Sequence, residues 1–375
     1  MTRRRSDLSP QSSVLSTVPW VEGMAPYAPP EDPEAIAASA GLPREALIKL
    51  DANENPYGAS PLVRAALADF AGYHLYPDPD QREIRRLLAS YADVDVGGLL
   101  AGNGSDELID LLCRIYLEPG DEVIDCTPTF GMYRFSAEFC GAQVLEAPRT
   151  SDWSIDVDAV EAALTRRTKL VFVASPNNPS GNLLDERALI ALLDTGRIIV
   201  VDEAYIEFSE RESWCGRVDG HSNLIVLRTF SKWAGLAGLR LGYGVFPAGV
   251  LRHLWKVKPP FNVNLAAVAA VRATLNDLPN VESSVGRIVE ERTRMAAELA
   301  EIDGLRVWPS RANFMLVEVE RGIASDLKQF LASRGIAVRA YGHPRLRGAI
   351  RISVGLPEHT DALVRAILDW RARGG

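Results

Sequence analysis

The sequence contains few cysteines and no long apolar run. Cys113, Cys126, Cys140 and Cys215 show neither Cys-x-x-Cys spacing nor a Cys/His pattern of metal ligands. We therefore expect buried, reduced thiols, as in an intracellular enzyme, and no metal site. No apolar run approaches the roughly 18–20 residues that a membrane-spanning helix needs, so we expect no membrane partner.

The N-terminus lacks the apolar segment of a secretory signal. Its first residues, MTRRRSDLSPQSS, carry arginines with no apolar stretch behind them. We predict that residues 1–15 form a flexible tail. Without a targeting or membrane segment, the expected location is cytoplasmic.

An excess of basic residues is also missing. The chain has 41 basic and 49 acidic residues and a net charge of −8. A nucleic-acid-binding protein needs a basic surface to neutralise phosphates, so we expect no nucleic-acid partner. The charge balance does not exclude small anionic substrates, because these need only a local cluster of arginines.

The length of 375 residues predicts two domains, because a single core rarely grows past about 250–300 residues. A change of pattern near residue 262 gives the boundary. The predicted parts are a flexible tail (1–15), an N-terminal arm with part of the small domain (16–55), a large domain (56–262) and a small C-terminal domain (263–375).

The fold class follows from alternating helix-like and strand-like segments. Continuous apolar runs at 169–176, 197–204 and 223–230 are typical of strands buried on both faces of a parallel sheet. Alternation of such strands with helices predicts an α/β domain, and the last third predicts a smaller α+β domain. A helix is expected to start at Ser60-Pro61, because serine can cap it and proline suits the first turn. Further expected helices are 80–92, 105–116, 129–141, 185–194, 264–302 with a break near 278–280, 323–334 and 357–372. Further expected strands are 98–104, 122–128, 305–310, 313–319, 335–341 and 348–355.

A lysine after a buried-type strand is the first candidate for chemistry. Lys232 lies in LRTFSKWAGLAGLRLGYG (227–244), between a serine and a glycine-rich stretch. Partial desolvation there lowers the pKa of an amine and favours an imine with an aldehyde. Thr229, Ser231 and Arg240 supply the hydroxyls and the cation that a bound phosphate requires. Viewed alone, the segment fits a solvated loop lysine better.

Three polar side chains follow neighbouring strands. Asp202 ends an apolar strand, where a carboxylate is costly unless it is paired, and a protonated pyridine nitrogen would supply the opposite charge. Capping of the strand end and binding of Mg²⁺ are the alternatives for Asp202. Tyr205 and Asn178, the latter in the turn SPNNPSG (175–181), would bind the phenolic oxygen of such a cofactor.

The segment AGNGSDELI (101–109) predicts a strand, a glycine turn and a helix start. Backbone N–H groups of Gly104, Ser105 and Asp106 would face a phosphate there. The segment matches half of the dinucleotide motif G-x-G-x-x-G, but position 107 is Glu, which disfavours a nicotinamide-dependent oxidoreductase. Phe130, in TPTFGMY, would stack on a cofactor ring or serve as an ordinary core aromatic.

Taken together and in this order, the segments resemble fold-type-I, class II-type aminotransferases that use pyridoxal 5'-phosphate (PLP), and most closely the histidinol-phosphate aminotransferase family. The resemblance covers about residues 18–372. It rests on LDANENPYG (50–58), GNGSDEL (102–108), PTFGMY (128–133), SPNNPSG (175–181), DEAYIEF (202–208), RTFSKWAGLAGLRLGYG (228–244) and IRISVG (350–355). It implies a large PLP-binding domain, with a mostly parallel central sheet flanked by helices, and a smaller α+β domain.

The resemblance implies PLP as cofactor and a role for each matching residue. Lys232 holds PLP as a Schiff base and shuttles a proton, Asp202 pairs with the pyridine nitrogen, and Phe130 stacks on the ring. Asn178 and Tyr205 bind the phenolic oxygen. The implied phosphate ligands are Gly104, Ser105, Asp106, Thr229, Ser231 and Arg240, together with Tyr76 from a partner subunit. The implied substrate-binding residues are Tyr27, Asn53, Arg339 and Arg351.

The implied activity is the transamination of L-histidinol phosphate with 2-oxoglutarate in histidine biosynthesis, by a homodimer with shared active sites. An aromatic amino-acid aminotransferase and a threonine-phosphate decarboxylase of the same fold stay open as alternatives. Three positions depart from the commonest family pattern. Ser180 replaces a frequent threonine, Phe130 replaces a frequent tyrosine, and Trp233 follows the lysine where a smaller or Phe-like residue is common.

Overall fold

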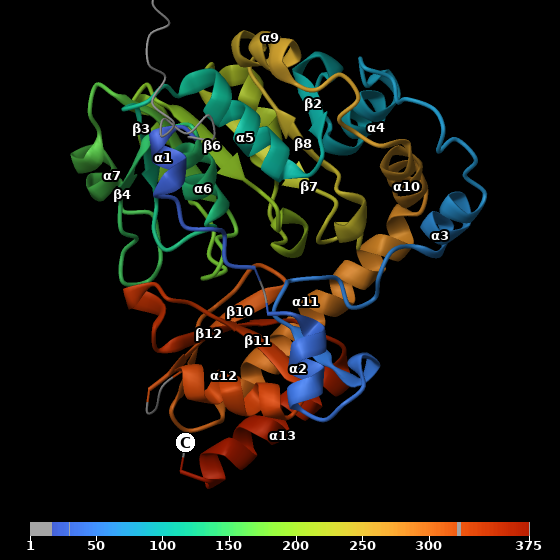
Figure 1. Ribbon diagram of the computed structural model, residues 1–375, viewed down its shortest axis with the longest axis vertical. Helices are drawn as coiled ribbons and strands as arrows, with labels where there is room; N and C mark the ends of the chain where they lie inside the picture. Colours follow the sequence, from blue (N-terminus) through green and yellow to red (C-terminus); the bar gives the residue numbers. More distant parts are fainter. Residues whose placement is uncertain (1–16, 30, 321–323, 375) are drawn as a thin grey trace, which may run out of the picture.

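The computed structural model describes residues 17–29, 31–320 and 324–374, which form two sheets with helices around them (Figure 1). One sheet has seven strands and the other has five. The tail predicted over residues 1–15 lies outside the described residues. No helix in the described ranges is both long enough and apolar enough to cross a membrane.

The seven-stranded sheet has the order β2-β8-β7-β6-β5-β3-β4. Strands β3 to β7 pair in parallel, and β8 runs antiparallel to both β7 and β2. The prediction of a mostly parallel sheet is therefore confirmed. The strands are β2 Leu99–Gly102, β3 Glu122–Asp125, β4 Gln143–Glu146, β5 Thr168–Ala174, β6 Ile198–Asp202, β7 Leu224–Thr229 and β8 Gly242–Val245.

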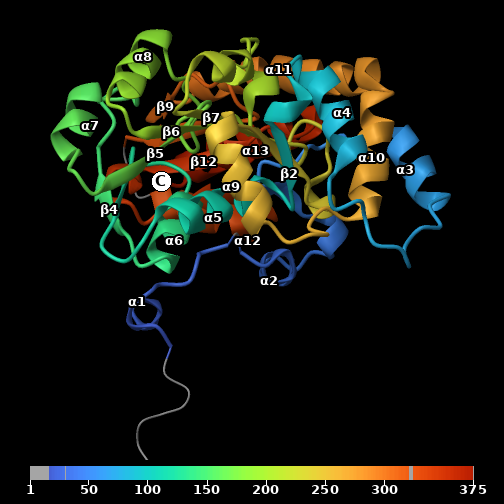
Figure 2. The same cartoon turned by 90° about the horizontal axis from the view of Figure 1, so that it is seen from above.

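Both faces of this sheet are buried, which explains the continuous apolar runs. On β5, Leu170 and Phe172 pack into one core, whereas Val171 and Val173 pack into the other. Successive side chains of a strand point to opposite faces, so each face needs its own layer of helices. Figure 2 shows α8 (Glu186–Asp194) on one side of the strands, and α5 (Ser105–Tyr116) and α6 (Met132–Phe139) on the other.

The five-stranded sheet has the order β1-β11-β12-β10-β9. Its strands are β1 Ile48–Leu50, β9 Leu305–Val307, β10 Phe314–Val319, β11 Ile336–Ala340 and β12 Ala349–Ser353. Strand β1 pairs in parallel with β11, and the other neighbours are antiparallel. The N-terminal segment thus supplies an edge strand to a sheet built from the last quarter of the chain.

The remaining helices are α1 Pro19–Glu22, α2 Pro33–Ser39, α3 Pro61–Ala68, α4 Arg82–Ala92, α7 Val157–Ala163, α9 Ala248–Val257, α10 Leu265–Leu275, α11 Leu278–Ala300, α12 Ala324–Ser333 and α13 Pro357–Ala372. Of these, α3, α4, α10, α11, α12 and α13 match predicted segments, whereas α1, α2, α7 and α9 were not predicted. The helix predicted over 129–141 begins only at Met132, because Thr129 Oγ1 bonds Asn177 Oδ1 at 2.7 Å and holds the preceding loop. The predicted break in 264–302 lies at Asn276–Asp277, since Pro279 fits the first turn of α11.

The architecture brings several chain segments to one edge of the large sheet. Strands β5, β6 and β7 are parallel, so Ala174, Asp202 and Thr229 end at the same edge. Strand β2 also leads to this edge, where α5 begins one turn later at Ser105. In open α/β sheets, ligands bind outside the carboxyl ends of the strands. The site is therefore expected at this edge, facing the five-stranded sheet.

Candidate active site

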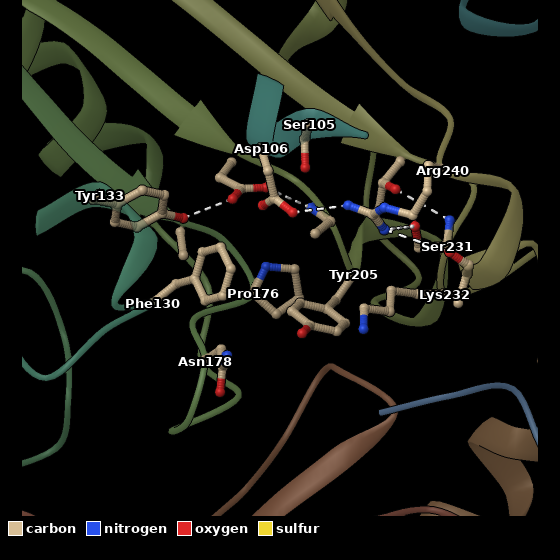
Figure 3. A pocket seen from close by; sticks show the side chains of 15 residues that line it. Ser105, Asp106, Phe130, Tyr133, Pro176, Asn178, Tyr205, Ser231, Lys232 and Arg240 are labelled. Atoms are coloured by element: carbon tan, nitrogen blue, oxygen red, sulfur yellow. Dashed lines mark hydrogen bonds and ion pairs between the residues drawn. The ribbon is translucent and has the colours of Figure 1, made fainter. Parts of the chain in front are cut away.

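A cavity lies at the carboxyl edge of the seven-stranded sheet (Figure 3). A second cavity adjoins it toward the five-stranded sheet, and the two share Phe130, Asn178, Tyr205 and Lys232 as lining residues. The first is lined by Ser105, Asp106, Phe130, Tyr133, Ala174, Pro176, Asn178, Asp202, Ala204, Tyr205, Thr229, Ser231, Lys232, Ala237 and Arg240. Most of the cofactor-binding residues predicted from the sequence thus line one cavity.

Lys232 extends into this cavity from the loop after β7. Its Nζ donates a hydrogen bond to the carbonyl oxygen of Ala52 at 3.2 Å. Burial, and to a smaller extent the nearby Arg351 guanidinium, lower the pKa of the Lys232 amine to about 8. A substantial share of this amine is therefore neutral near pH 8, as a nucleophile or a base requires.

Asp202 is the buried carboxylate of the site. It ends β6, is 4% exposed, and accepts hydrogen bonds from the Tyr133 hydroxyl at 2.7 Å and from the Ala204 N–H at 3.1 Å. Burial raises the pKa of Asp202 to about 6, although both hydrogen bonds act in the opposite direction. The carboxylate is ionised at neutral pH and faces the cavity, and no cation of the described residues bonds to it. A positively charged ring nitrogen bound there would supply the missing charge.

Tyr133 is a site residue that the sequence analysis missed. Its ring is fully buried on α6, stacked 4.9 Å from the Phe172 ring at an interplanar angle of 3°. Phe130, in the loop before α6, meets it edge-on at 5.6 Å. The available signal was the spacing of three residues from Phe130, which would place the two side chains on one face of the helix predicted over 129–141. Since a tyrosine in an apolar helix is usually a core residue, that signal was weak.

The start of α5 and the Lys232 loop form a polar cradle. Gly104 has φ of 81°, and no side chain caps the first turn of α5. Arg240 faces this turn: its Nη2 lies 2.9 Å from Asp106 Oδ2, and its Nη1 lies 3.4 Å from Ser231 Oγ. The positive φ explains the glycine, and a Cβ at position 104 would also lie 2.6 Å from Arg240 Nη2, so that this side chain would have to move.

This cradle suits a phosphate group. An uncapped helix start offers free N–H groups and the positive end of the helix dipole, and Arg240 adds a full charge. The Thr229 hydroxyl accepts a hydrogen bond from the Ser231 N–H at 3.1 Å and so shapes the turn that carries both side chains. The donor set of the cavity therefore fits PLP at both ends: an anion cradle at one and a buried carboxylate at the other.

The second cavity carries the predicted substrate residues. Arg351 Nη1 donates to Asn178 Oδ1 at 2.7 Å, and Nη2 donates to the Asp51 carbonyl oxygen. The buried Nε of Arg351 has no hydrogen-bond partner among the described residues. Tyr341, which the sequence analysis did not name, also lines this cavity, and its hydroxyl lies 3.4 Å from Asn178 Oδ1.

Tyr27, Asn53 and Arg339 line the same cavity. The Arg339 guanidinium donates to the carbonyl oxygens of Ala28 and Pro29, so it binds the N-terminal segment next to Tyr27. Asn53 is only 1% exposed, and its Nδ2 donates to the Tyr205 hydroxyl at 3.0 Å.

Apart from Gly104, Tyr76 is the one predicted site residue that lines neither cavity of this chain. It is 80% exposed and stacks on Phe261, with ring centroids 4.5 Å apart. A residue of the chain's own site would be expected to point inward, so within one subunit Tyr76 has no role at the cavity.

Comparison with known proteins places the chain in a family. The model of the aminotransferase class I and II family matches residues 45–369. A histidinol-phosphate aminotransferase of Dehalococcoides mccartyi is 45% identical over 347 residues, which are 92% of this chain and 95% of that protein. One of Roseiflexus castenholzii is 47% identical over 355 residues, covering 92% and 95%.

Solved structures agree with this assignment. A crystal structure of histidinol-phosphate aminotransferase from Sinorhizobium meliloti, in complex with pyridoxal-5'-phosphate, superposes with a TM-score of 0.85 and 27% identity. The match covers 95% of this chain and 97% of that one. The fold class and the family resemblance predicted from the sequence are both confirmed. The chain belongs to the aminotransferase class I and II family.

Proposed function

We propose that the chain is a PLP-dependent enzyme that transfers the amino group of L-histidinol phosphate to 2-oxoglutarate, giving imidazole-acetol phosphate and L-glutamate, in the histidine biosynthesis of the cytoplasm. One observation carries the cofactor assignment. A lysine with a lowered pKa, a buried carboxylate without a cation and a cationic anion cradle line the same cavity. This set matches an amine-binding aldehyde that has a basic ring nitrogen and a phosphate.

The residues that would hold PLP follow from their chemistry. Gly104, Ser105, Asp106, Thr229, Ser231 and Arg240 would bind its phosphate, and Phe130 would contact the ring face. Asp202 would hold the ring nitrogen protonated, and Asn178 and Tyr205 would bind the phenolic oxygen. When bound, PLP supplies an aldehyde for amines and a ring that takes up the electron pair left when a proton leaves the neighbouring carbon.

The reaction needs a base that moves a proton, and Lys232 would be that base. Lys232 would also hold the cofactor between turnovers, and its neutral amine would take the proton from the substrate carbon that carries the amino group. Its lowered pKa makes the neutral form available near pH 8. Asp202 keeps its negative charge throughout and stabilises the positive ring nitrogen.

The substrate proposal rests on the relatives and on the second cavity. Both relatives described above are named histidinol-phosphate aminotransferases, at 45% and 47% identity across most of the chain. The substrate pair comprises a phosphomonoester and a dicarboxylate, so one site must bind both anions. Arg351 and Arg339 line that cavity, and guanidinium groups suit both phosphate and carboxylate.

The test is a half-reaction with the purified, PLP-loaded protein. L-Histidinol phosphate alone should convert the absorbance of the bound cofactor to that of its amine form, and 2-oxoglutarate should then restore it with release of glutamate. Phenylalanine and threonine phosphate are the comparison substrates. A response to phenylalanine alone, or release of CO₂ from threonine phosphate, would replace this proposal with one of the two alternatives.

A homodimer with shared active sites is the second part of the proposal. The exposed, stacked Tyr76 would reach the PLP phosphate of the partner subunit. Mixing the two weak variants Tyr76→Ala and Lys232→Ala should restore activity. Random pairing in a two-fold dimer puts half of the protein into mixed dimers with one intact site each, so recovery should reach about a quarter of wild type. Activity equal to the sum of the two separate variants would show that Tyr76 does not act across subunits.

A further inference from the structure

Asn53 has an unusual backbone for a buried residue. It lies in the loop between β1 and α3 with φ of 56° and 1% exposure. Asparagine is among the few non-glycine residues that adopt this left-handed conformation readily. The conformation turns its side chain toward the junction of the two sheets. There Asn53 forms hydrogen bonds with Ser353, Asn313 and Tyr205.

Ser353 of the five-stranded sheet and Asn313, the residue before β10, hold Asn53 in place. The Ser353 hydroxyl donates to Asn53 Oδ1 at 2.8 Å and accepts from the Asn53 N–H at 2.9 Å. Asn313 Nδ2 donates to the Asn53 carbonyl oxygen at 3.0 Å. Since Oδ1 accepts from Ser353, the amide nitrogen Nδ2 is the atom that points toward Tyr205.

The third contact determines the orientation of Tyr205. Asn53 Nδ2 donates to the Tyr205 hydroxyl at 3.0 Å. The hydroxyl oxygen is thus an acceptor in this bond, and its own hydrogen is left for a group in the cavity that Tyr205 lines. An edge-on contact of the Tyr205 ring with Phe314, at 5.0 Å, restricts movement of the ring itself.

We propose that Asn53 is a positioning residue: it directs the Tyr205 O–H to the phenolic oxygen of the bound cofactor and ties this hydrogen bond to β12 through Ser353. The inference rests on the proposed function and deepens it. Strand β12 also carries Arg351, two residues before Ser353. The same strand therefore carries the Arg351 guanidinium of the second cavity and the serine that holds Asn53.

The test measures the cofactor rather than turnover. The readout is the pH midpoint of the absorbance change of PLP bound to the holoenzyme without substrate. A hydrogen bond donated to the phenolic oxygen favours its anionic form, so losing the bond should raise this midpoint. One hydrogen bond of ordinary strength corresponds to roughly 0.5–1 pH unit. The charged and titratable groups around Tyr205 are Lys232, Arg351, Asp202 and Tyr341, and the variants leave all four unchanged.

The informative variant is Asn53→Gly, because glycine accepts the left-handed backbone and only the side chain is lost. It should raise the midpoint in the same direction as Tyr205→Phe. The double variant should shift no further than Tyr205→Phe alone. Ser353→Ala should give a smaller shift of the same sign, since it removes the link to β12 but leaves the Asn53 amide.

Gln81→Gly is the matched control. Gln81 is another buried amide side chain at a left-handed residue, with φ of 54° and 4% exposure, and it lines neither cavity. It should cost stability without moving the midpoint. Additive shifts in the double variant, or an Asn53→Gly midpoint equal to wild type, would overturn the role of Asn53 and leave the proposed function standing. A wild-type protein that binds no PLP would overturn both.

Discussion

Replacing Lys232 with alanine should lower kcat by at least roughly a thousandfold, because the substrate proton then has no base in reach. Lys232 Nζ is buried in the cavity, and burial lowers the pKa of this amine to about 8. The variant should still bind PLP, since the anion cradle of Arg240 and Ser231 is unchanged. The measurement is the rate of glutamate formation with saturating L-histidinol phosphate and 2-oxoglutarate.

The covalent role of Lys232 can be measured apart from turnover. Borohydride should fix PLP permanently to the wild-type protein and leave the alanine variant unlabelled by mass spectrometry. The rate at which the cofactor-free wild-type protein takes up PLP covalently should rise with pH, with a midpoint of about 8, because only the neutral amine attacks an aldehyde. A midpoint near the ordinary lysine value of 10.5 would mean that the amine is not desolvated.

Lys258→Ala is the matched control for this variant. Lys258 is also a partly buried lysine whose pKa is lowered by burial, but its Nζ bonds the carbonyl oxygens of Pro259 and Pro260 and it lines neither cavity. Its removal should leave both labelling and turnover close to wild type. Near-wild-type turnover of Lys232→Ala would remove the base from the proposed mechanism.

The parts of the fold that the sequence predicted are those set by local pattern. The short strands of the large sheet are buried on both faces, so their sequences are continuously apolar, as at 169–176, 197–204 and 223–230. Ser60 and Pro61 start α3 as capping chemistry requires, with Ser60 Oγ accepting from the Leu62 N–H at 3.1 Å. The domain boundaries at 56 and 262 stay predictions.

Long-range pairing was beyond the sequence analysis. The parallel pairing of Ile48–Leu50 with β11 joins residues nearly 300 positions apart. A strand of only three residues is also too short to show the alternation of apolar and polar residues that predicts a strand. The contacts of Asn53 and the presence of Tyr133 in the site were not foreseen for the same reason. Their hydrogen bonds to Tyr205 and Asp202 depend on where the sheets and α6 come to lie, whereas the turn and helix patterns around them are ordinary.

The candidate site was more predictable than these contacts, because its residues follow strands that share one edge. Asp202 ends β6, Lys232 lies three residues after the end of β7, and Ser105 begins the helix after β2. Parallel strands bring such positions together without further information. The sequence did not point to Tyr341, because this residue follows β11 of the other sheet. No local sequence pattern shows where that sheet lies relative to this edge.

Replacing Asp202 with asparagine should lower kcat by roughly 10²–10³-fold, the usual loss when a charge aimed at the reacting group is removed in a buried site. Asparagine has the same shape, and the Tyr133 hydroxyl can accept from its amide instead of donating to a carboxylate. The loss should therefore come from the charge. Asp125→Asn is the control: Asp125 is also a buried carboxylate at a strand end, with a pKa that burial raises to about 7, but it lines neither cavity.

The same variant should be more stable than wild type when PLP is absent. Burial raises the pKa of Asp202 from 3.8 to about 6, so the folded state binds the proton more tightly than the unfolded state does. The free energy of unfolding of the empty wild-type protein therefore falls as pH rises through this window. The asparagine side chain of the variant does not ionise, so the variant does not lose this stability. The empty variant should match wild type near pH 4 and exceed its Tm by roughly 3–8 °C above pH 7.

Loading with PLP should reverse this order. The protonated ring nitrogen gives the Asp202 carboxylate its missing partner, so PLP should raise the Tm of the wild type more than that of Asp202→Asn. Asp125→Asn should gain stability in the empty protein as well, yet respond to PLP as wild type does, because its carboxylate lies outside the cavity. If PLP stabilised wild type and Asp202→Asn equally, the carboxylate would not be the partner of the ring nitrogen, and the activity loss of the variant would need another cause.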